Sequence, residues 1–227
     1  MMSWPSAGAN AVRIELYKSL EIKKGVTAII GSGGKTSLML RLCRDLPGTV
    51  IVCTSTHIFP PEGLPLYTEA LTAMPVPKLC VGTPAENGKL TAPVQSFEEL
   101  AGLADYVLVE ADGSKHLPLK AHLDHEPVIP ACANQVIQVL GISGIGRPIR
   151  EAAHRPALYA ELAGTEQDAV VTVEIAAAVV GRENLHTKIY VNQLDAHPGM
   201  DEARRMAALL NCPVLAGSLW KGEYFVC

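Results

Sequence analysis

A loop of three glycines followed by a lysine and two hydroxyl residues is the part of this sequence best suited to chemistry. It follows the apolar run 26–30 and precedes a helix-competent stretch over 38–43. Strand, glycine-rich loop and helix in this order are typical of a P-loop nucleotide-binding site. The candidate nucleotide-binding residues of the loop are Gly31, Ser32, Gly33, Gly34, Lys35, Thr36 and Ser37.

The chemistry of such a loop follows from its residue types. Glycines let backbone N–H groups turn inward as an anion nest, and the start of the next helix adds its positive dipole end. Lys35 is expected to reach the terminal phosphates, and Thr36 to hold Mg²⁺. The pattern is incomplete, because Ile29 stands where the full P-loop has its first glycine. The shorter Gly-x-x-Gly-Lys-Thr resembles the loop of Mur-type peptide ligases and of some metal-insertion ATPases and GTPases. The alternative is a glycine-rich turn beside an unrelated lysine.

Acidic residues follow the buried apolar run 106–109. An acid at the end of a buried strand is where P-loop proteins hold Mg²⁺ or its water. Glu110 is predicted to bind Mg²⁺ together with Thr36, and Asp112 to assist it or to orient water, so that both acids face the metal. The alternative is a strand-end turn with Gly113.

The segment 191–195 resembles the Asn-Lys-x-Asp element of GTPases, with Gln193 in place of lysine. Asp195 would accept hydrogen bonds from N1–H and the exocyclic amine of guanine, and adenine presents no such donor pair. Asn192 would tie this segment back to the P-loop or touch the base. An ordinary strand-end turn is the alternative. The segment 215–218 lies where GTPases place a short loop against the guanine oxygen, but its residues favour a plain turn.

Three further clusters contain residues able to bind or catalyse. His57, after the apolar run 49–54, is a candidate general base or metal ligand, or simply a hydrogen-bonded polar residue. The histidines and lysines of 114–125 lack the tight spacing of a metal site, which favours a surface or substrate-contacting loop. The basic segment 147–155 would either close over phosphate as a lid or form a solvated surface.

The elements that must position these residues alternate between strands and helices. Strands are predicted over 26–30, 49–54, 78–81, 106–109, 135–140, 188–191 and 214–216, and helices over 11–24, 35–46, 97–103, 156–163, 172–180 and 200–210, with Gly25 and Gly181 as helix stops. This alternation indicates right-handed crossovers and a mostly parallel sheet flanked by helices. The predicted fold is a three-layer α/β architecture of the P-loop NTPase type. It forms a single domain over 1–227, with a Pro/Gly-rich insertion or edge region at about 58–95.

Bulk properties narrow the class of protein. The hydrophobic fraction is 48% and aromatic residues make up only 5%, which suits a parallel sheet buried on both faces by aliphatic side chains. A net charge of −4 without long runs of one sign argues against nucleic-acid or membrane-surface binding. No signal peptide or membrane-spanning run is predicted, and six scattered cysteines suit reduced thiols in the cytoplasm.

Six segments of the chain carry a family resemblance: 31–37, 54–57 (Thr-Ser-Thr-His), 109–115 (Val-Glu-Ala-Asp-Gly-Ser-Lys), 118–120, 125–130 (His-Glu-Pro-Val-Ile-Pro) and 154–156. Together they resemble the selenium-dependent hydroxylase accessory proteins, the YqeC family. It implies a role in the maturation of molybdenum hydroxylases that carry a labile selenium, with such an enzyme or its cofactor-assembly proteins as partner. The GTPases of nickel-enzyme maturation are a parallel by analogy only.

The residues themselves suggest the reaction. They predict a nucleotide-binding accessory protein that hydrolyses GTP in preference to ATP, with Mg²⁺ as cofactor. Catalysis would be mostly positioning and electrostatics by Lys35, Glu110 and Asp112, with His57 as a further candidate. One alternative is a small-molecule kinase or phosphate-activating ligase, in which His57 and the segment 114–125 grip an acceptor. Another is a non-hydrolysing module that binds nucleotide and acts through a partner.

Overall fold

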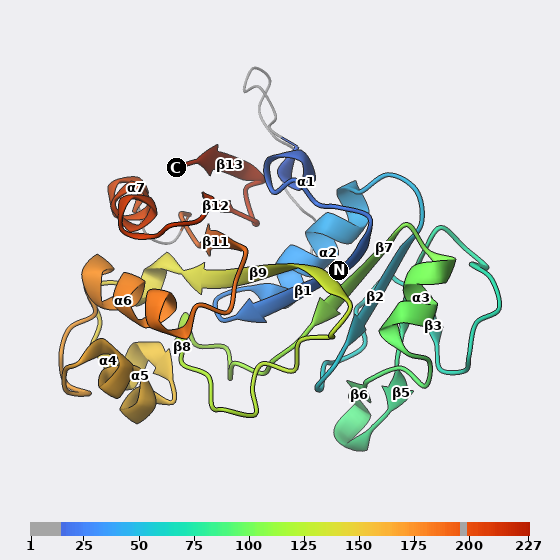
Figure 1. Cartoon of the computed structure of the whole chain (residues 1–227), viewed down its shortest axis with the longest axis horizontal. Coiled ribbons are helices and arrows are strands. Elements are labelled where there is room, and N and C mark those ends of the chain that lie inside the picture. Colours follow the sequence, from blue (N-terminus) through green and yellow to red (C-terminus); the bar gives the residue numbers. More distant parts are fainter. Residues whose placement is uncertain (1–14, 196–198) are drawn as a thin grey trace.

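The computed structural model describes residues 15–195 and 199–227, and in these ranges nine strands form one sheet (Figure 1). Neighbouring strands are parallel except at one edge, where β13 runs antiparallel to β12. The mostly parallel α/β sheet predicted from the sequence is therefore confirmed. The order across the sheet is β13 (Glu223–Val226), β12 (Val214–Ser218), β11 (Lys188–Asn192), β9 (Ala133–Gly141), β1 (Gly25–Gly31), β7 (Tyr106–Glu110), β2 (Val50–Thr54), β4 (Lys78–Val81) and β3 (Leu66–Tyr67).

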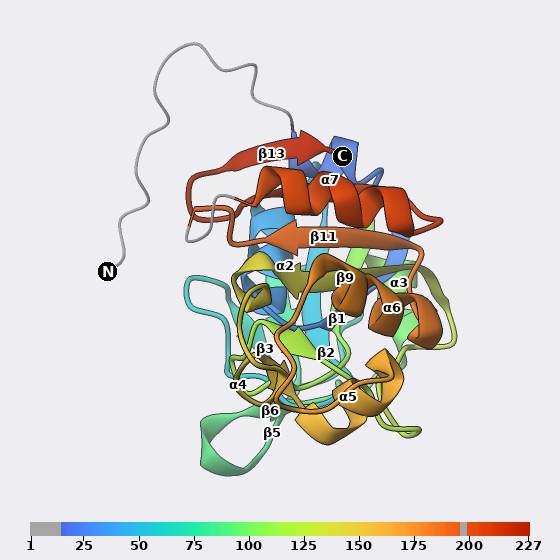
Figure 2. The ribbon, with the colours of Figure 1, turned by 90° about the vertical axis from the view of Figure 1, so that its left-hand side faces the viewer.

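Helices cover both faces of this sheet. On one face lie α1 (Leu16–Ser19) and α2 (Lys35–Asp45), and on the other lie α3 (Phe97–Leu103), α6 (Val173–Glu183) and α7 (Met200–Leu209). Figure 2 shows α2 and α6 on opposite sides of the central strands.

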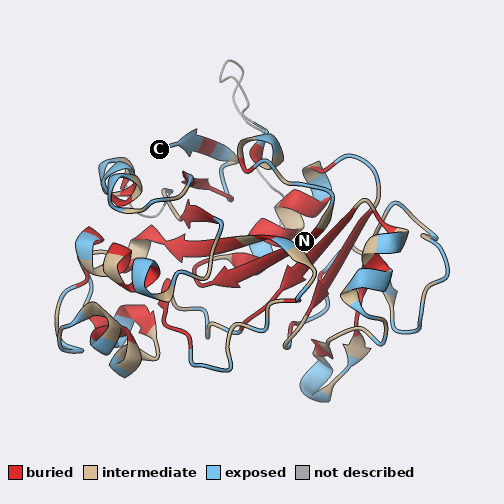
Figure 3. Ribbon diagram, viewed as in Figure 1, coloured by how far each residue is buried: buried red, intermediate tan, exposed pale blue. Residues whose placement is uncertain are grey.

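The strand residues divide between the two layers by simple alternation. In β2, Val50 and Val52 pack with the α2 layer, whereas Ile51 and Cys53 pack with α3. Because both faces are covered, β2 is buried along its whole length and β1 along nearly all of it (Figure 3).

Shorter elements flank the large sheet. β8 (Leu119–Lys120) pairs in parallel with β10 (Ala153–His154), which contacts α4 (Ile149–Ala152) and α5 (Pro156–Ala163). β5 (Thr83–Pro84) and β6 (Leu90–Thr91) form an antiparallel pair around the 3₁₀ turn Glu86–Gly88, and a second 3₁₀ turn, Ile142–Gly144, follows β9. The Pro/Gly-rich region 58–95 thus supplies the β5–β6 pair, the edge strand β3 and its neighbour β4.

Two predicted helix bounds are wrong. In the described residues the helix expected over 11–24 is only the four residues of α1, because Glu21 takes a left-handed conformation (φ 45°) and Gly25 begins β1. Positions 11–14 of that prediction lie outside the described residues. Gly181 does not end α6, which continues to Glu183 and stops where Asn184 turns left-handed.

The six cysteines are free thiols, as their scattered spacing predicted. Among the helices of the described ranges, none is long and apolar enough to cross a membrane.

Candidate functional site: the loop between β1 and α2

The glycine-rich loop turns the chain sharply from the end of β1 into α2. Gly31, Gly33 and Gly34 have φ values of 91°, 88° and 130°, which residues with a side chain rarely adopt. At Gly33 the requirement is also steric, because an added Cβ would lie 2.4 Å from the backbone nitrogen of Gly141 in β9. Glycine therefore allows both the turn and its close packing against the neighbouring strand.

The start of α2 offers hydrogen-bond donors to an open space. No side chain caps the helix at Gly34, and the first turn contains Lys35 followed by the exposed residues Thr36 and Ser37. Uncapped N–H groups and the helix dipole make such a terminus attractive to anions. The loop and this turn line a cavity of about 810 Å³, within the size range of small-molecule sites.

Lys35 is among the residues that line this cavity, and only 2% of its side-chain area is exposed. Its Nζ donates to the carbonyl oxygen of Gly31 at 2.8 Å. It also lies 3.1 Å from Oδ1 of Asp112 and 3.8 Å from Oε1 of Glu110. The ammonium is therefore a fixed positive charge between the glycine loop and the acids that follow β7.

Asp112 is fully buried at the centre of a cluster of charges. Its Oδ2 accepts a hydrogen bond from the backbone N–H of Gly31 at 2.8 Å and lies 2.7 Å from Nε2 of His122. The same oxygen lies 3.1 Å from Nζ of Lys120. Its Oδ1 has the contact with Lys35 but no aligned hydrogen bond among the described residues.

The second ring nitrogen of His122 meets Glu183, from the last turn of α6. Nδ1 lies 3.0 Å from Oε2, and the backbone N–H of His122 donates to Oε1 at 2.6 Å. Burial lowers the pKa of His122, but hydrogen bonds to Asp112 and Glu183 raise it by more. Burial likewise raises the pKa of Asp112, and its cationic neighbours lower it by more. Both shifts favour a charged pair.

Thr36 and Glu110 face each other at the cavity wall. Oγ1 of Thr36 donates to Oε2 of Glu110 at 2.6 Å. Burial raises the pKa of Glu110, opposed by the charge of Lys35 and the hydrogen bond from Thr36. A hydroxyl and a carboxylate are oxygen ligands of the kind that Mg²⁺ binds, so these two residues fit the predicted magnesium site.

The expectation that both acids face the metal is not met for Asp112. Glu110 lines the cavity, whereas Asp112 does not. The reason is that the carboxylate of Asp112 is drawn beneath the loop by the N–H of Gly31 and by His122. It supports the loop and its lysine rather than facing open space.

Asn192, at the end of β11, is hydrogen-bonded to the glycine loop. Its Nδ2 donates to the carbonyl oxygen of Gly33 at 2.8 Å, and its Oδ1 accepts from the backbone N–H of Leu219 at 3.2 Å. Of the two roles predicted for Asn192, these contacts match the tie to the loop. One side chain thus joins the loop to the chain segment that follows β12.

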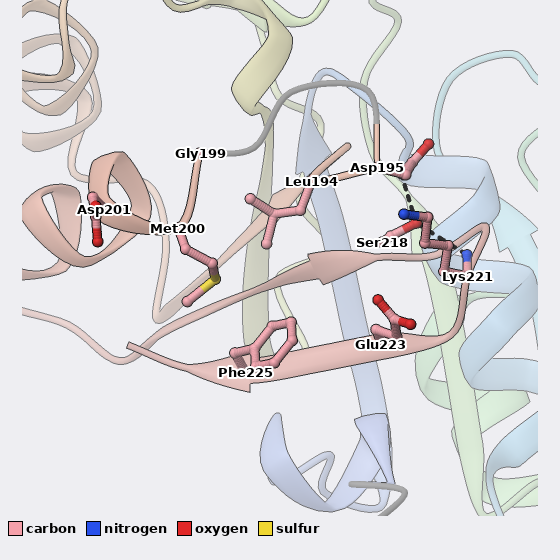
Figure 4. A pocket seen from close by; sticks show the side chains of 9 residues that line it. All are labelled: Leu194, Asp195, Gly199, Met200, Asp201, Ser218, Lys221, Glu223 and Phe225. Carbon is pink, nitrogen blue, oxygen red and sulfur yellow. Dashed lines mark hydrogen bonds between the residues drawn. The ribbon is translucent and has the colours of Figure 1, made fainter. Parts of the chain in front are cut away.

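Asp195 lines a second, smaller cavity of about 250 Å³ (Figure 4). Its Oδ1 accepts a hydrogen bond from Oγ of Ser218, the last residue of β12, at 2.6 Å. The segments 191–195 and 215–218 are therefore in contact, and 215–218 belongs to β12 instead of forming the plain turn that its residues favoured. Asp195 does not line the larger cavity, although Asn192 and Gln193 do.

Comparison with known proteins identifies the family. The family model described as "YqeC protein" matches residues 27–157, more than half of the chain. The chain belongs to the YqeC family. It is 32% identical over 175 residues to the Escherichia coli (strain K12) protein named "Uncharacterized protein YqeC", an alignment covering 68% of this chain and 67% of the relative. No solved structure matches this chain significantly. The family range contains the glycine loop, Glu110 and Asp112, whereas Asn192 and Asp195 lie beyond it.

In this YqeC-family protein the predicted histidine clusters separate. His57 and His116 are exposed and line the larger cavity, whereas His122 is buried beside Asp112 and His125 is exposed elsewhere. Within the described ranges, no group of three or more histidine, cysteine or acidic side chains is arranged to hold a metal ion.

The basic segment 147–155 also divides. Arg155 forms two hydrogen bonds with the carboxylate of Glu126, at 2.7 and 2.8 Å. Arg150 pairs with Asp168 on the surface. In the part of the chain that the structure describes, His154 alone of this segment lines the larger cavity.

Sequence reasoning missed two acids of the buried charge cluster. Glu183 lies 61 residues from its partner His122, and no local pattern marks it. Glu126 accepts a hydrogen bond from Lys120 at 2.8 Å, in addition to those from Arg155. Its position within the segment 125–130, one of those that resemble the YqeC family, was a signal that could have singled it out.

Proposed function

We propose that this protein binds a nucleoside triphosphate with Mg²⁺ at the loop between β1 and α2 and hydrolyses it, with GTP preferred over ATP. The observation that carries the proposal is the placement of Lys35. Lys35 lines the 810 Å³ cavity at an uncapped helix start, and its buried ammonium is bonded to the glycine loop, where three glycines have positive φ. A fixed cation among free N–H donors suits a polyphosphate.

The proposed roles follow from these positions. Lys35 and the loop N–H groups stabilise negative charge on the phosphate oxygens. Thr36 and Glu110 hold Mg²⁺, which when bound neutralises charge on the phosphates. Asp112 is a positioning residue, because its carboxylate fixes Lys35 and does not line the cavity. His57, exposed at the cavity wall, is the candidate base for the attacking water.

The base is proposed to lie beside the ends of β11 and β12. The hydrogen bond from Ser218 to Oδ1 of Asp195 fixes the carboxylate, and Oδ2 is then available to accept from guanine. Asn192 holds the glycine loop next to this segment. The support for GTP over ATP is therefore the acceptor chemistry of Asp195.

Titrations with fluorescent GTP and ATP, with and without Mg²⁺, followed by a phosphate-release assay, test the proposal. We expect tighter binding of GTP and release of phosphate without an added acceptor. Lys35→Ala should weaken binding about tenfold to hundredfold, as expected for a lost charge-assisted hydrogen bond. Lys24→Ala, at a lysine whose side chain is 73% exposed, is the control.

The other outcomes separate the alternative functions. If phosphate is transferred only when an acceptor is added, the protein is a kinase or a phosphate-activating ligase and not a hydrolase. Tight binding without turnover would leave a nucleotide-binding module. Unchanged affinity in Lys35→Ala would remove the proposed site altogether.

We also propose that nucleotide turnover serves the maturation of selenium-dependent molybdenum hydroxylases, with such an enzyme or its cofactor-assembly proteins as partner. The support is the role that the family resemblance implies. Cells lacking this protein should lose selenium from that hydroxylase and regain it with the wild-type chain. Lys35→Ala should fail to restore it, and restoration by this variant would disconnect the pathway from the nucleotide site.

A further inference from the structure

We propose that the larger cavity binds a second ligand beside the nucleotide: a small organic anion with a flat apolar part. The inference rests on the proposed function for the part of the cavity that the nucleotide fills. The glycine loop and Asn192 form one wall of this cavity, and Phe59, Lys89 and Lys115 form another. We call this second wall, together with His116, the basic wall.

The basic wall lies on the opposite side of β1 from the proposed base site. In the sheet, β11 lies two strands from β1 on one side, and β7 and β2 lie on the other. Lys115 belongs to the loop after β7, and Phe59 to the chain after β2. A triphosphate that extends from Asn192 across the glycine loop therefore ends where the basic wall begins. The cavity continues beyond that point.

The basic wall carries unbalanced positive charge. In the described ranges neither Lys89 nor Lys115 has an acidic partner, whereas the acids at the cavity are paired. Glu126 is bound by Lys120 and Arg155, and Glu110 by the residues at the start of α2. Unpaired lysines facing a shared cavity favour an anionic ligand.

An aromatic ring accompanies this charge. Phe59 is 61% exposed, and Nζ of Lys89 lies 5.3 Å from the centre of its ring. The two residues are held side by side because Ile58 and Leu90 exchange backbone hydrogen bonds at 3.0 and 2.7 Å. A cation beside an exposed ring suits a ligand with a charged group and a flat apolar part.

Two further features point to ligand binding in this cavity. Lys115 and His116 both adopt left-handed φ values (47° and 59°), a costly conformation that is concentrated at functional sites. His154, from β10, also lines the cavity and adds an imidazole ring to it.

Phosphorus NMR titrations test the second site. The protein is saturated with Mg²⁺ and a non-hydrolysable GTP analogue, then titrated with inorganic phosphate or phenyl phosphate at constant ionic strength. We expect both probes to bind, phenyl phosphate about threefold more tightly because its ring contacts Phe59. Phe59→Ala should remove only that advantage.

Substitutions that remove one lysine charge test whether the basic wall binds the probes. Lys89→Gln and Lys115→Gln should each weaken both probes about fivefold. Lys23→Gln, at an exposed lysine near the start of β1, should bind like wild type. The second site is refuted if the loaded protein binds neither probe, if the probes only displace the analogue, or if both lysine variants bind like wild type.

A separate measurement keeps this result distinct from the proposed function. Phosphate is titrated into unloaded wild-type protein and unloaded Lys35→Ala. If the analogue does not bind, but phosphate binding depends on Lys89 and Lys115 and not on Lys35, the nucleotide proposal fails and the anion site remains. If phosphate binding depends on Lys35 alone, the second site is overturned.

Discussion

Nζ of Lys35 lies 3.1 Å from Oδ1 of Asp112, and the two side chains are 2% and 0% exposed. The positive charge of the lysine proposed to bind phosphate is thus already paired with a carboxylate beneath the glycine loop. Asp112 keeps two other cationic partners, Lys120 and His122, on its Oδ2. Lys35 can therefore share its charge with a phosphate without leaving Asp112 unpaired, which is the property required of a charge that must serve an arriving ligand.

A double-mutant cycle measures this relationship. Lys35→Ala and Asp112→Asn should each lower the free energy of unfolding by about 2–4 kcal/mol, because each leaves a buried charge short of a partner. The double variant should lose about 1 kcal/mol less than the sum, since the two residues are in contact. Urea unfolding near neutral pH provides the values, and strict additivity would show that the pair is not coupled.

The surface pair Lys24–Asp105 is the matched control for that cycle. Its charged atoms lie 2.7 Å apart, but the lysine side chain is 73% exposed. Lys24→Ala should therefore lower the free energy of unfolding far less than Lys35→Ala does.

The raised pKa of His122 predicts a specific dependence of stability on pH. Burial lowers this pKa, and Asp112 and Glu183 raise it by more. Because the folded pKa exceeds the unfolded value of about 6.5, the stabilisation is complete below that pH and is lost as pH rises through the folded pKa. Wild type should therefore lose more unfolding free energy than His122→Gln as the pH rises above about 6.5.

Chemical unfolding at a series of pH values tests this expectation. His125→Gln, at an exposed histidine, should follow the wild-type curve. Parallel curves for wild type and His122→Gln would mean that His122 does not carry a proton between its two acids.

Local signals in the sequence specify many of the elements that carry the site. Ser96 and Glu99 form a reciprocal capping box, and α3 has the predicted bounds Phe97–Leu103. Pro156 begins α5 at its first position, and that helix also has its predicted bounds. The apolar runs predicted as strands form the buried strands of the sheet that carries the glycine loop. Each of these signals acts within a few residues, so it can be interpreted without knowing the fold.

Contacts between distant segments could not be predicted in the same way. Glu183 reaches His122 only because α6 packs beside the chain that follows β7. Asp112 turns beneath the loop because that histidine and the N–H of Gly31 bind it there. The basic wall likewise combines residues from separate loops. Local spacing contains no information on such encounters, and the orientation of Asp112 was accordingly mispredicted.

The contact between Thr36 and Glu110 predicts how Mg²⁺ enters nucleotide binding. Thr36→Ala removes the hydroxyl that donates to Oε2 of Glu110 at 2.6 Å. We expect the gain in nucleotide affinity on adding Mg²⁺ to fall about tenfold, as for one lost oxygen contact, with Mg²⁺-free binding unchanged. Thr36→Ser, which keeps the hydroxyl, should restore the gain. An unaltered response to Mg²⁺ in Thr36→Ala would place the metal elsewhere.

Asn192 is predicted to hold the glycine loop in shape. Asn192→Ala leaves the carbonyl of Gly33 and the N–H of Leu219 without partners, and should lower the free energy of unfolding by about 1–3 kcal/mol. Nucleotide affinity should fall with it, because the loop loses a fixed point. Asn134→Ala, which removes an exposed hydrogen bond to the carbonyl of Lys24, should cost less in unfolding experiments. Equal losses would mean that burial of the Asn192 contacts adds nothing.

If Asp195 recognises the base, its substitution should change which nucleotide binds best and should not weaken all nucleotides equally. Asp195→Asn replaces an acceptor by an amide that can donate to the carbonyl oxygen that xanthine carries in place of the guanine amine. Binding of GTP should weaken about tenfold, xanthosine triphosphate should gain, and ATP should be unaffected. Asp201→Asn, at an exposed acid lining the same small cavity, is the matched control and should leave all three affinities unchanged. An equal loss for GTP and ATP would show that Asp195 supports the fold near the site without reading the base.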